Sequence, residues 1–242
     1  MENFQKIVVN FKLRKRQPFF TCFKGIVKLF LKKPKIVNLN DNIEEKSILI
    51  ANHCNIRGPW LYELYLPKKH ALWGAHEMLC NYSSRRKYLR DVFYIQKQGY
   101  SKRKASFIAT IFAVFSPMPY KGMRVLPTFQ NARLKETVKR SIDILEKNVP
   151  VMIFPEDSSK GYFEKLTALF PGFVTLSEAY YKKTGVDLPI YPIYYNTAKR
   201  VMMIGKPCYV QEYVKQGLDR RQIAEIYLTK INELNDLIKE KY

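Results

Sequence analysis

The feature that most constrains the fold is an alternation along the chain. From residue 36 onward, short apolar runs alternate with stretches in which apolar residues recur at helical spacing. This alternation is typical of α/β proteins, in which helices cover a central sheet. We expect strands over residues 47–51, 71–75, 123–128, 150–154, 188–195 and 200–205, and helices over residues 59–65, 101–115, 132–147, 172–183 and 219–241.

The first 36 residues differ in charge from the rest. They contain ten Lys and Arg against Glu2 alone, a net charge of +9 (10 − 1). Apolar residues at helical spacing occur there between Pro18 and Pro34, with lysines among them. The segment either lies as a basic amphipathic helix in the headgroup layer of an anionic membrane or packs its apolar stripe on the domain core. We favour the membrane and expect a membrane-surface segment (residues 1–36) and one catalytic-size domain (residues 37–242).

The charge of the whole chain points to anionic partners. Forty-two Lys and Arg against 21 Asp and Glu give a net charge of +21, which suits a membrane surface, phosphate-bearing ligands, nucleic acid or an acidic carrier protein. Four scattered cysteines indicate reduced thiols. No signal peptide is evident, and no run approaches the roughly 20 apolar residues that span a bilayer. We therefore expect a cytoplasmic protein, bound peripherally to the inner face of the membrane.

The first candidate site follows the strand expected over residues 47–51. That strand leads directly into Asn52 and His53, and Gly58 and Pro59 then begin a helix. His53 is thus expected at the carboxyl end of a strand, where open α/β sheets have their ligand crevices. An imidazole with a pKa of about 6.5 is a competent base near neutrality. A histidine that only hydrogen-bonds its own loop is equally compatible with this local sequence.

The second candidate site follows the strand expected over residues 150–154. Here the chain continues with Glu156, Asp157, Ser158 and Ser159. Hydroxyl groups and backbone N–H groups after a strand can hold an oxyanion or a phosphate. The alternative is a turn rich in Ser and Asp that caps the next segment.

With two further blocks, these motifs form an ordered series. The series is Asn52-His53, the strand expected over residues 123–128, Phe154-Pro155-Glu156, and Pro189-Ile190-Tyr191-Pro192. In order and spacing it resembles the glycerolipid acyltransferases of the lysophosphatidate (1-acylglycerol-3-phosphate) acyltransferase type, over roughly residues 45 to 205. The resemblance implies a mixed central sheet flanked by helices, as in glycerol-3-phosphate acyltransferases, and a role in phospholipid synthesis or remodelling.

The resemblance also implies roles for individual residues. His53 would deprotonate a hydroxyl of a lysophospholipid-like acceptor, which attacks the thioester of acyl-CoA or of an acidic acyl carrier protein. Glu156 matches the glutamate of the third block, and Ser158 stands where the family has threonine. Asn52 and Ser159 are expected beside them in the acceptor site. Because a thioester is already activated, the resemblance implies neither a metal nor a bound cofactor.

The first block departs from the family pattern. In the family, four residues separate the histidine from an aspartate that orients the imidazole, and this chain has Gly58 at that position. Loss of the orienting carboxylate costs about 10⁴ in turnover, near 5 kcal/mol, in hydrolase triads. The candidate replacements are a backbone carbonyl and the carboxylates of Glu156, Asp157 and Glu63.

The arginines expected to hold a phosphate are missing as well. Pro127 and Thr128 replace the Asp-Arg pair of the second block, and Ser159 replaces the arginine of the third. A lysine can supply charge but lacks the bidentate fork of arginine. The basic residues expected to bind phosphate instead are Arg57, Lys121, Arg124 and Lys160.

Two functions of other classes remain open. The chain could retain the fold and bind lipid or acyl carrier without turnover, because its blocks are altered. It could also bind nucleic acid through a basic cluster interleaved with tyrosines, with a net charge of +7 (8 − 1, against Asp91). No binding motif supports that reading, so we expect no nucleic-acid partner. The cluster comprises Arg85, Arg86, Lys87, Arg90, Lys97, Lys102, Arg103 and Lys104.

Overall fold

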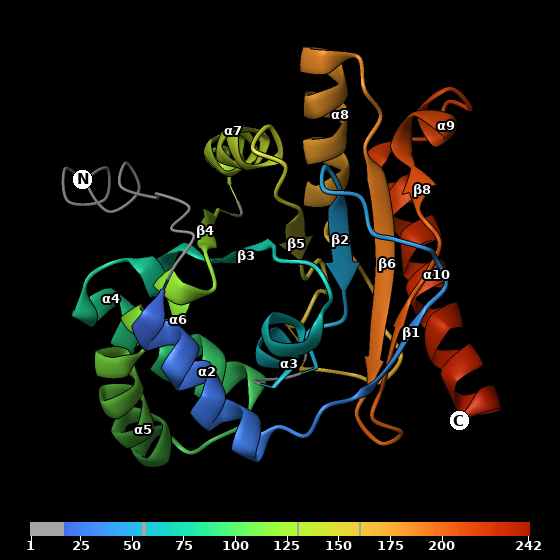
Figure 1. The fold of residues 1–242 in the computed structure, drawn as a ribbon. Coiled ribbons are helices and arrows are strands. Elements are labelled where there is room, and N and C mark those ends of the chain that lie inside the picture. Colours follow the sequence, from blue (N-terminus) through green and yellow to red (C-terminus); the bar gives the residue numbers. More distant parts are fainter. Residues whose placement is uncertain (1–16, 55–56, 130, 160) are drawn as a thin grey trace.

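A single mixed sheet forms the centre of the computed structural model, which describes residues 17–54, 57–129, 131–159 and 161–242. Its strand order is β1-β7-β6-β2-β5-β3-β4, and β8 pairs with β6 (Figure 1). The strands are β1 (Lys35–Asn38), β2 (Ile48–Ala51), β3 (Ala71–Ala75), β4 (Val125–Thr128), β5 (Val151–Ile153), β6 (Pro189–Asn196), β7 (Val201–Ile204) and β8 (Cys208–Tyr209).

Strand direction fixes where the loops meet. The strands β4, β3, β5, β2 and β6 run parallel to one another, whereas β7 and β8 pair with β6 in the antiparallel sense. Residues 197–200 form the turn between β6 and β7. The mixed α/β fold class expected from the sequence is confirmed.

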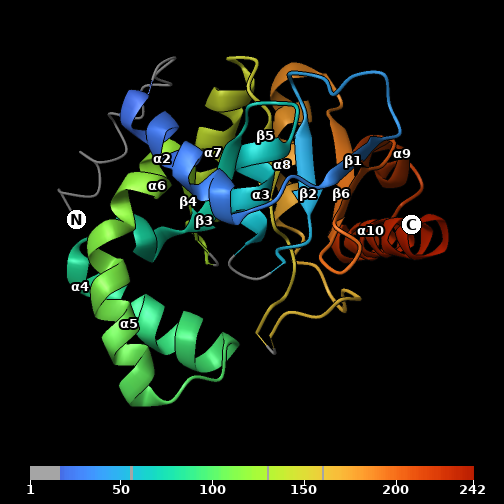
Figure 2. The ribbon, with the colours of Figure 1, turned by 60° about the horizontal axis from the view of Figure 1, so that its bottom comes forward.

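Helices cover both faces of the sheet (Figures 1 and 2). Period-two alternation in β2 sends Ile48 and Ile50 into one core, shared with α7, α8 and α10, and Leu49 and Ala51 into the other, shared with α2 and α3. The helical elements are α2 (Pro18–Phe30), α3 (Gly58–Tyr65), the 3-10 helix η1 (His76–Leu79), α4 (Tyr82–Tyr88), the π-helix η2 (Leu89–Lys97), α5 (Lys102–Phe115), α6 (Pro117–Gly122), α7 (Leu134–Leu145), α8 (Gly172–Thr184), α9 (Val210–Val214) and α10 (Arg220–Lys241).

Local sequence explains several helix boundaries. At the start of α10, the side chain of Asp219 accepts a hydrogen bond from the backbone N of Gln222, whose side chain accepts one from the backbone N of Asp219. At the end of α8, Gly185 adopts a positive φ of 74°, which glycine tolerates best. The helices expected over residues 172–183 and 219–241 are confirmed.

Residues 82–115 form a helical module of α4, η2 and α5 beside the sheet, at the left in Figure 1. Only α5 was expected from the sequence. Arg85 donates hydrogen bonds to the backbone oxygens of Cys80 and Ala113, and Arg86 donates to the side chains of Thr110 and Ser106. These two arginines of the basic cluster therefore join α4 to its neighbours.

The helix α2 packs one side on the domain and exposes the other. Phe20 is buried, with its ring centroid 6.2 Å from that of Trp60, and Lys24 forms an ion pair with Glu63 at 2.9 Å. Phe19 and Phe30, by contrast, are exposed. One side of this helix thus packs on the domain core, and contact of the other side with a membrane stays a prediction.

The boundary expected after residue 36 falls inside β1, which pairs with β7. Residues 1–16 of the expected membrane-surface segment lie outside the described residues. No helix within the described ranges has both the length and the apolar character needed to cross a bilayer.

Candidate functional site

The two candidate motifs meet at the carboxyl edge of the sheet. His53 lies two residues beyond the end of β2, and Glu156 lies three residues beyond the end of the neighbouring parallel strand β5. The backbone N of His53 donates a hydrogen bond of 3.1 Å to Oε2 of Glu156. The structure thus brings together the predicted base and the predicted glutamate, which are 103 residues apart in the sequence.

Aromatic rings surround the imidazole of His53, which is half-buried. Its centroid lies 4.9 Å from that of Tyr162, with an interplanar angle of 22°, and 5.0 Å from that of Phe154, with an angle of 65°. A stacked ring on one side and an edge contact on the other restrict the orientation of the imidazole.

The carboxyl group of Glu156 is held in a largely dry environment. The residue is 8% exposed, and burial raises its pKa above the ordinary value. Backbone hydrogen bonds from His53 and Phe163 and the positive charge of Lys97 act in the opposite direction. Glu156 therefore fixes the backbone of the His53 loop and holds a carboxyl group with a raised pKa next to that loop.

Lys97 reaches the site from the carboxyl end of η2. Its Nζ donates a hydrogen bond of 2.7 Å to Oγ of Ser158 and lies 5.7 Å from the ring centroid of Tyr162. Burial lowers its pKa, while Glu156 and Asp157 raise it. The sequence analysis did not single out Lys97 as a site residue; the available signal was its place in the basic cluster.

The amide of Asn52 joins the ends of β2 and β6. Its Oδ1 accepts hydrogen bonds from the backbone N of Tyr195 (2.9 Å) and from the hydroxyl of Tyr62 (2.8 Å). Its Nδ2 donates to the backbone O of Tyr195 (3.0 Å) and to Sγ of Cys54 (2.8 Å). Asn52, which is 4% exposed, therefore lies in the scaffold beneath His53 and not on an open surface.

Cys54 adjoins His53 but is poorly suited to act as a nucleophile. Burial raises the pKa of its thiol, and Sγ donates a hydrogen bond of 3.1 Å to the backbone O of Tyr195. A thiolate is the reactive form of cysteine, so this environment disfavours covalent catalysis by Cys54.

Gly58 stands in close contact with the His53 loop. A Cβ built at Gly58 would lie 1.8 Å from the backbone O of His53 and 2.7 Å from its carbonyl carbon. Because these are backbone atoms, they cannot move aside as the end of a side chain can. The local geometry therefore excludes the aspartate of the family pattern at this position.

The other candidate carboxylates point to different partners. Glu63 pairs with Lys24 of α2, on the side of α3 that faces that helix. Asp157 accepts a hydrogen bond of 3.0 Å from the backbone N of Ser159 within its own loop. Of the three carboxylates considered from the sequence, Glu156 contacts His53 by accepting a hydrogen bond from its backbone N.

Two predicted phosphate ligands require correction. Lys121 and Arg124 precede β4, and the backbone O of Arg124 accepts a hydrogen bond from Leu72 at the start of β3. Since β4 runs parallel to β3, β5 and β2, its amino end lies at the opposite edge of the sheet from His53, and its four residues alone span roughly 10 Å. The structure does not bring these two residues to the site.

Of the remaining predicted residues that the structure describes, two are exposed and one is buried. Arg57 is exposed beside the start of α3, and Ser159 is exposed and accepts a hydrogen bond of 3.5 Å from Gln96 through its backbone O. Ser158 is buried, and its Oγ accepts the hydrogen bond from Lys97. Lys160, also predicted to bind phosphate, lies outside the described residues.

A pocket of about 570 Å³ opens beside His53. The pocket is lined by Asn52 and Cys54, the two neighbours of His53 in the sequence, and by Tyr162, which stacks on the imidazole. Its walls are mainly aromatic, and Arg57 supplies positive charge at its border. The aromatic lining residues are Phe93, Tyr94, Tyr100, Tyr162, Phe163, Tyr194 and Tyr195.

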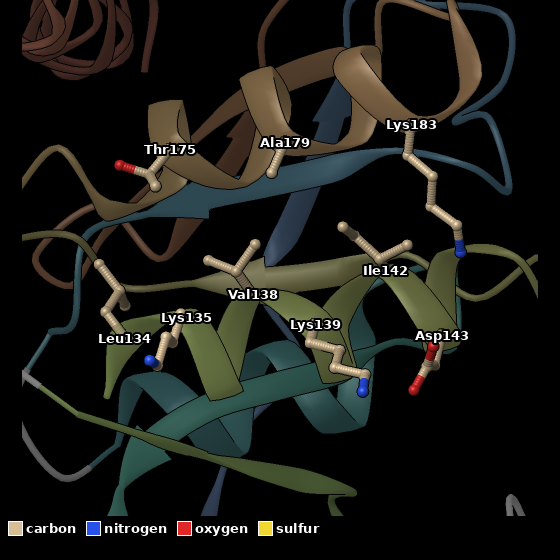
Figure 3. Close-up of a pocket in the computed structure, with 9 residues that line it drawn as sticks. All are labelled: Leu134, Lys135, Val138, Lys139, Ile142, Asp143, Thr175, Ala179 and Lys183. Atoms are coloured by element: carbon tan, nitrogen blue, oxygen red, sulfur yellow. The ribbon is translucent and has the colours of Figure 1, made fainter. Parts of the chain in front are cut away.

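A separate hollow of about 500 Å³ lies between α7 and α8 (Figure 3). Val138, Ile142 and Ala179 form its apolar floor, with lysines on the rim. None of its lining residues belongs to the loops that follow β2 and β5, so we do not assign acyl-group chemistry to it.

Comparison with known proteins supports the fold alone. No family model matches the chain, and no curated protein matches it in sequence. Among solved structures, the 1-acyl-sn-glycerophosphate (LPA) acyltransferase PlsC from Thermotoga maritima is similar over 98% of this chain and 88% of that chain, with a TM-score of 0.55 and 10% sequence identity. The chain thus has a fold of the PlsC acyltransferase type.

Proposed function

We propose that the chain is an acyltransferase that moves a fatty acyl group from acyl-CoA or an acyl carrier protein to a hydroxyl of a lysophospholipid-like acceptor. The observation behind this proposal is the place of His53 on a PlsC-like fold. The residue lies at the carboxyl edge of the sheet, next to Glu156 and to an aromatic pocket.

In the proposed reaction, the imidazole of His53 accepts the proton of the acceptor hydroxyl. The oxygen forms a bond to the thioester carbonyl carbon, and the carbon–sulfur bond then breaks. The departing thiolate takes the proton from the imidazolium, which restores the neutral base. These reaction steps involve only atoms of the two substrates and of the His53 imidazole.

The imidazole must be oriented without the family's aspartate. We propose that the rings of Tyr162 and Phe154 set its plane, and that Glu156 fixes the loop through the backbone N of His53. The carboxyl of Glu156 also lies close enough to contribute negative charge beside an imidazolium in the transition state.

We further propose that Lys97 replaces the missing arginines as the cation that holds an acceptor phosphate. Its ammonium group is already positioned by Ser158, in the loop that follows β5. Desolvation strengthens the attraction between a buried cation and a phosphate oxygen. Arg57, at the border of the pocket, could add a second positive charge.

The chain could instead bind lipid or acyl carrier without turnover. One observation favours this second function: Gly58 is required by the geometry of the loop, so the orienting aspartate cannot be present there. In this case the pocket and Lys97 would still bind a ligand, but no product would form.

Transfer from labelled acyl-CoA or acyl carrier protein to a panel of lysolipids tests the main proposal. We expect product with the wild type and a loss of at least about 10²-fold with His53→Ala, the lower end of general-base contributions. Full activity in His53→Ala would refute the assignment of the base. Ligand binding by the wild type without product under any donor would establish the second function instead.

Lys97→Met tests the phosphate site, with Lys182→Met as the matched control because Lys182 is exposed on α8. We expect Lys97→Met to raise KM for a phosphate-bearing acceptor and to leave KM for monoacylglycerol unchanged. Equal effects on both acceptors would show that Lys97 acts only on the structure of the loop.

A further inference from the structure

The helix α5 has its apolar faces in an unusual arrangement. Its buried residues are Ala105, Ala109 and Ala113, each 0% exposed, which pack on the rest of the helical module. Its bulky side chains face outward instead: Phe107 and Phe115 are each 69% exposed. A surface helix of a globular protein normally buries its large apolar residues, so this face indicates a contact with something outside the chain.

The outward side chains form a continuous face. Phe107, Ile111 and Val114 are spaced by four and three residues, which places them on one side of the helix, opposite the alanines. Both Ile111 and Val114 are more than 40% exposed. The exposed side chain of Met118, on α6, continues the apolar surface from the end of α5.

The surface extends toward α2 through α6. The helix α6 contacts both α5 and α2, and the three helices lie on the same side of the molecule in Figures 1 and 2. On α2, Phe19, Leu29 and Phe30 are each at least 79% exposed. The two helices that carry these exposed apolar side chains thus lie on one side of the molecule.

The charge of this surface indicates which kind of partner binds it. No Asp or Glu occurs in residues 92–135, which include α5 and α6, or in residues 3–40, which include α2. Lys102, Arg103 and Lys104 are exposed in the first turn of α5. An apolar face on helices that carry basic but no acidic residues fits anionic headgroups above an acyl layer, and mutual repulsion opposes its pairing with a second copy.

We infer that α5, with α6 and the exposed side of α2, inserts its apolar side chains into an anionic lipid bilayer. The aromatic side chains enter the boundary between headgroups and acyl chains, and the basic first turn of α5 contacts the headgroups. Tyr94 connects this surface to the site: its ring lies 6.4 Å from that of Phe112 on α5 and also lines the pocket beside His53. The inference does not depend on acyl transfer.

Flotation of the full chain with vesicles tests this surface. We expect the wild type to bind vesicles that contain phosphatidylglycerol, to bind phosphatidylcholine vesicles more weakly, and to lose affinity as salt is raised. In the double variant Phe107→Asp/Phe115→Asp, affinity for the anionic vesicles should fall about 100-fold. Because both side chains are exposed, a thermal melt followed by circular dichroism should match that of the wild type.

Val186→Asp is the control, since Val186 is 53% exposed in the loop between α8 and β6, away from these helices. It should bind vesicles like the wild type. Binding of the double variant equal to that of the wild type would overturn the inference, as would failure of the wild type to bind anionic vesicles. A wild-type dimer that the double variant abolishes, with vesicle binding unchanged, would assign the face to a second copy instead. Transfer to a short-chain, water-soluble acceptor, measured in parallel, reports separately on the proposed acyltransferase function.

Discussion

Replacing Asn52 by alanine tests whether this residue belongs to the scaffold or to the acceptor site. The substitution removes the Oδ1 atom that accepts hydrogen bonds from the backbone N of Tyr195 and from the hydroxyl of Tyr62. Tyr62 is 0% exposed and Tyr195 is 6% exposed, so water does not readily replace the lost acceptor. Each buried donor left without an acceptor costs about 1–3 kcal/mol, and two such donors predict a loss of about 2–6 kcal/mol in the free energy of unfolding.

Equilibrium unfolding in urea measures this loss, provided that the m-value stays unchanged. Tyr62→Phe is the matched control, because it removes one of the two hydrogen bonds and leaves the backbone N of Tyr195 paired with Asn52. It should cost about 0.5–1.5 kcal/mol. If Asn52→Ala loses less free energy of unfolding than Tyr62→Phe, the scaffold argument is refuted. If Asn52→Ala keeps its stability and raises KM for the acceptor, Asn52 belongs to the binding site.

Three further predictions follow from single contacts. Gly58→Ala should abolish acyl transfer and lower the thermal midpoint, because its Cβ would meet the backbone O of His53. Gly25→Ala, within α2 and with no atom within 4 Å of the added Cβ, should lower neither, since alanine favours the helix more than glycine does. Burial raises the folded-state pKa of Glu156 above its ordinary value of 4.5, so its contribution to stability is present below pH 4.5 and is lost as the pH rises through the folded-state pKa. Relative to Glu156→Gln, the stability of the wild type in urea titrations should therefore decline as the pH rises from 4.5 through the folded-state pKa. Parallel curves for the two proteins would contradict this. Arg86→Met removes two side-chain hydrogen bonds between α4 and α5 and should cost about 1–3 kcal/mol; an unchanged urea midpoint would show that they do not join the two helices.

Much of the fold was predictable because its signals are local. The strand over residues 71–75 was predicted to its exact ends, and the helices over residues 172–183 and 219–241 within one residue, since apolar periodicity and capping residues mark them. The strands β1 and β8 were missed because each is short and half-exposed, with little apolar pattern. The π-helix η2 was missed because its periodicity differs from that of an α-helix.

The structure brings predicted site residues together where sequence order implies position. His53 and Glu156 follow neighbouring parallel strands, so their meeting at one edge follows from topology. Lys121 and Arg124 lie at the opposite edge, because residues that precede a strand lie at its amino end.

By itself, the sequence determined the alternation of strands and helices, the placement of a histidine and a glutamate after two strands, and the strong positive charge. Only the tertiary structure decided that Lys97 reaches Ser158, that Gly58 must lack a side chain, and that α5 buries alanines while exposing phenylalanines. The division has a physical reason. Hydrogen-bonded periodicity and capping depend on residues within a few positions of one another, whereas these three features depend on which surfaces of distant segments come into contact.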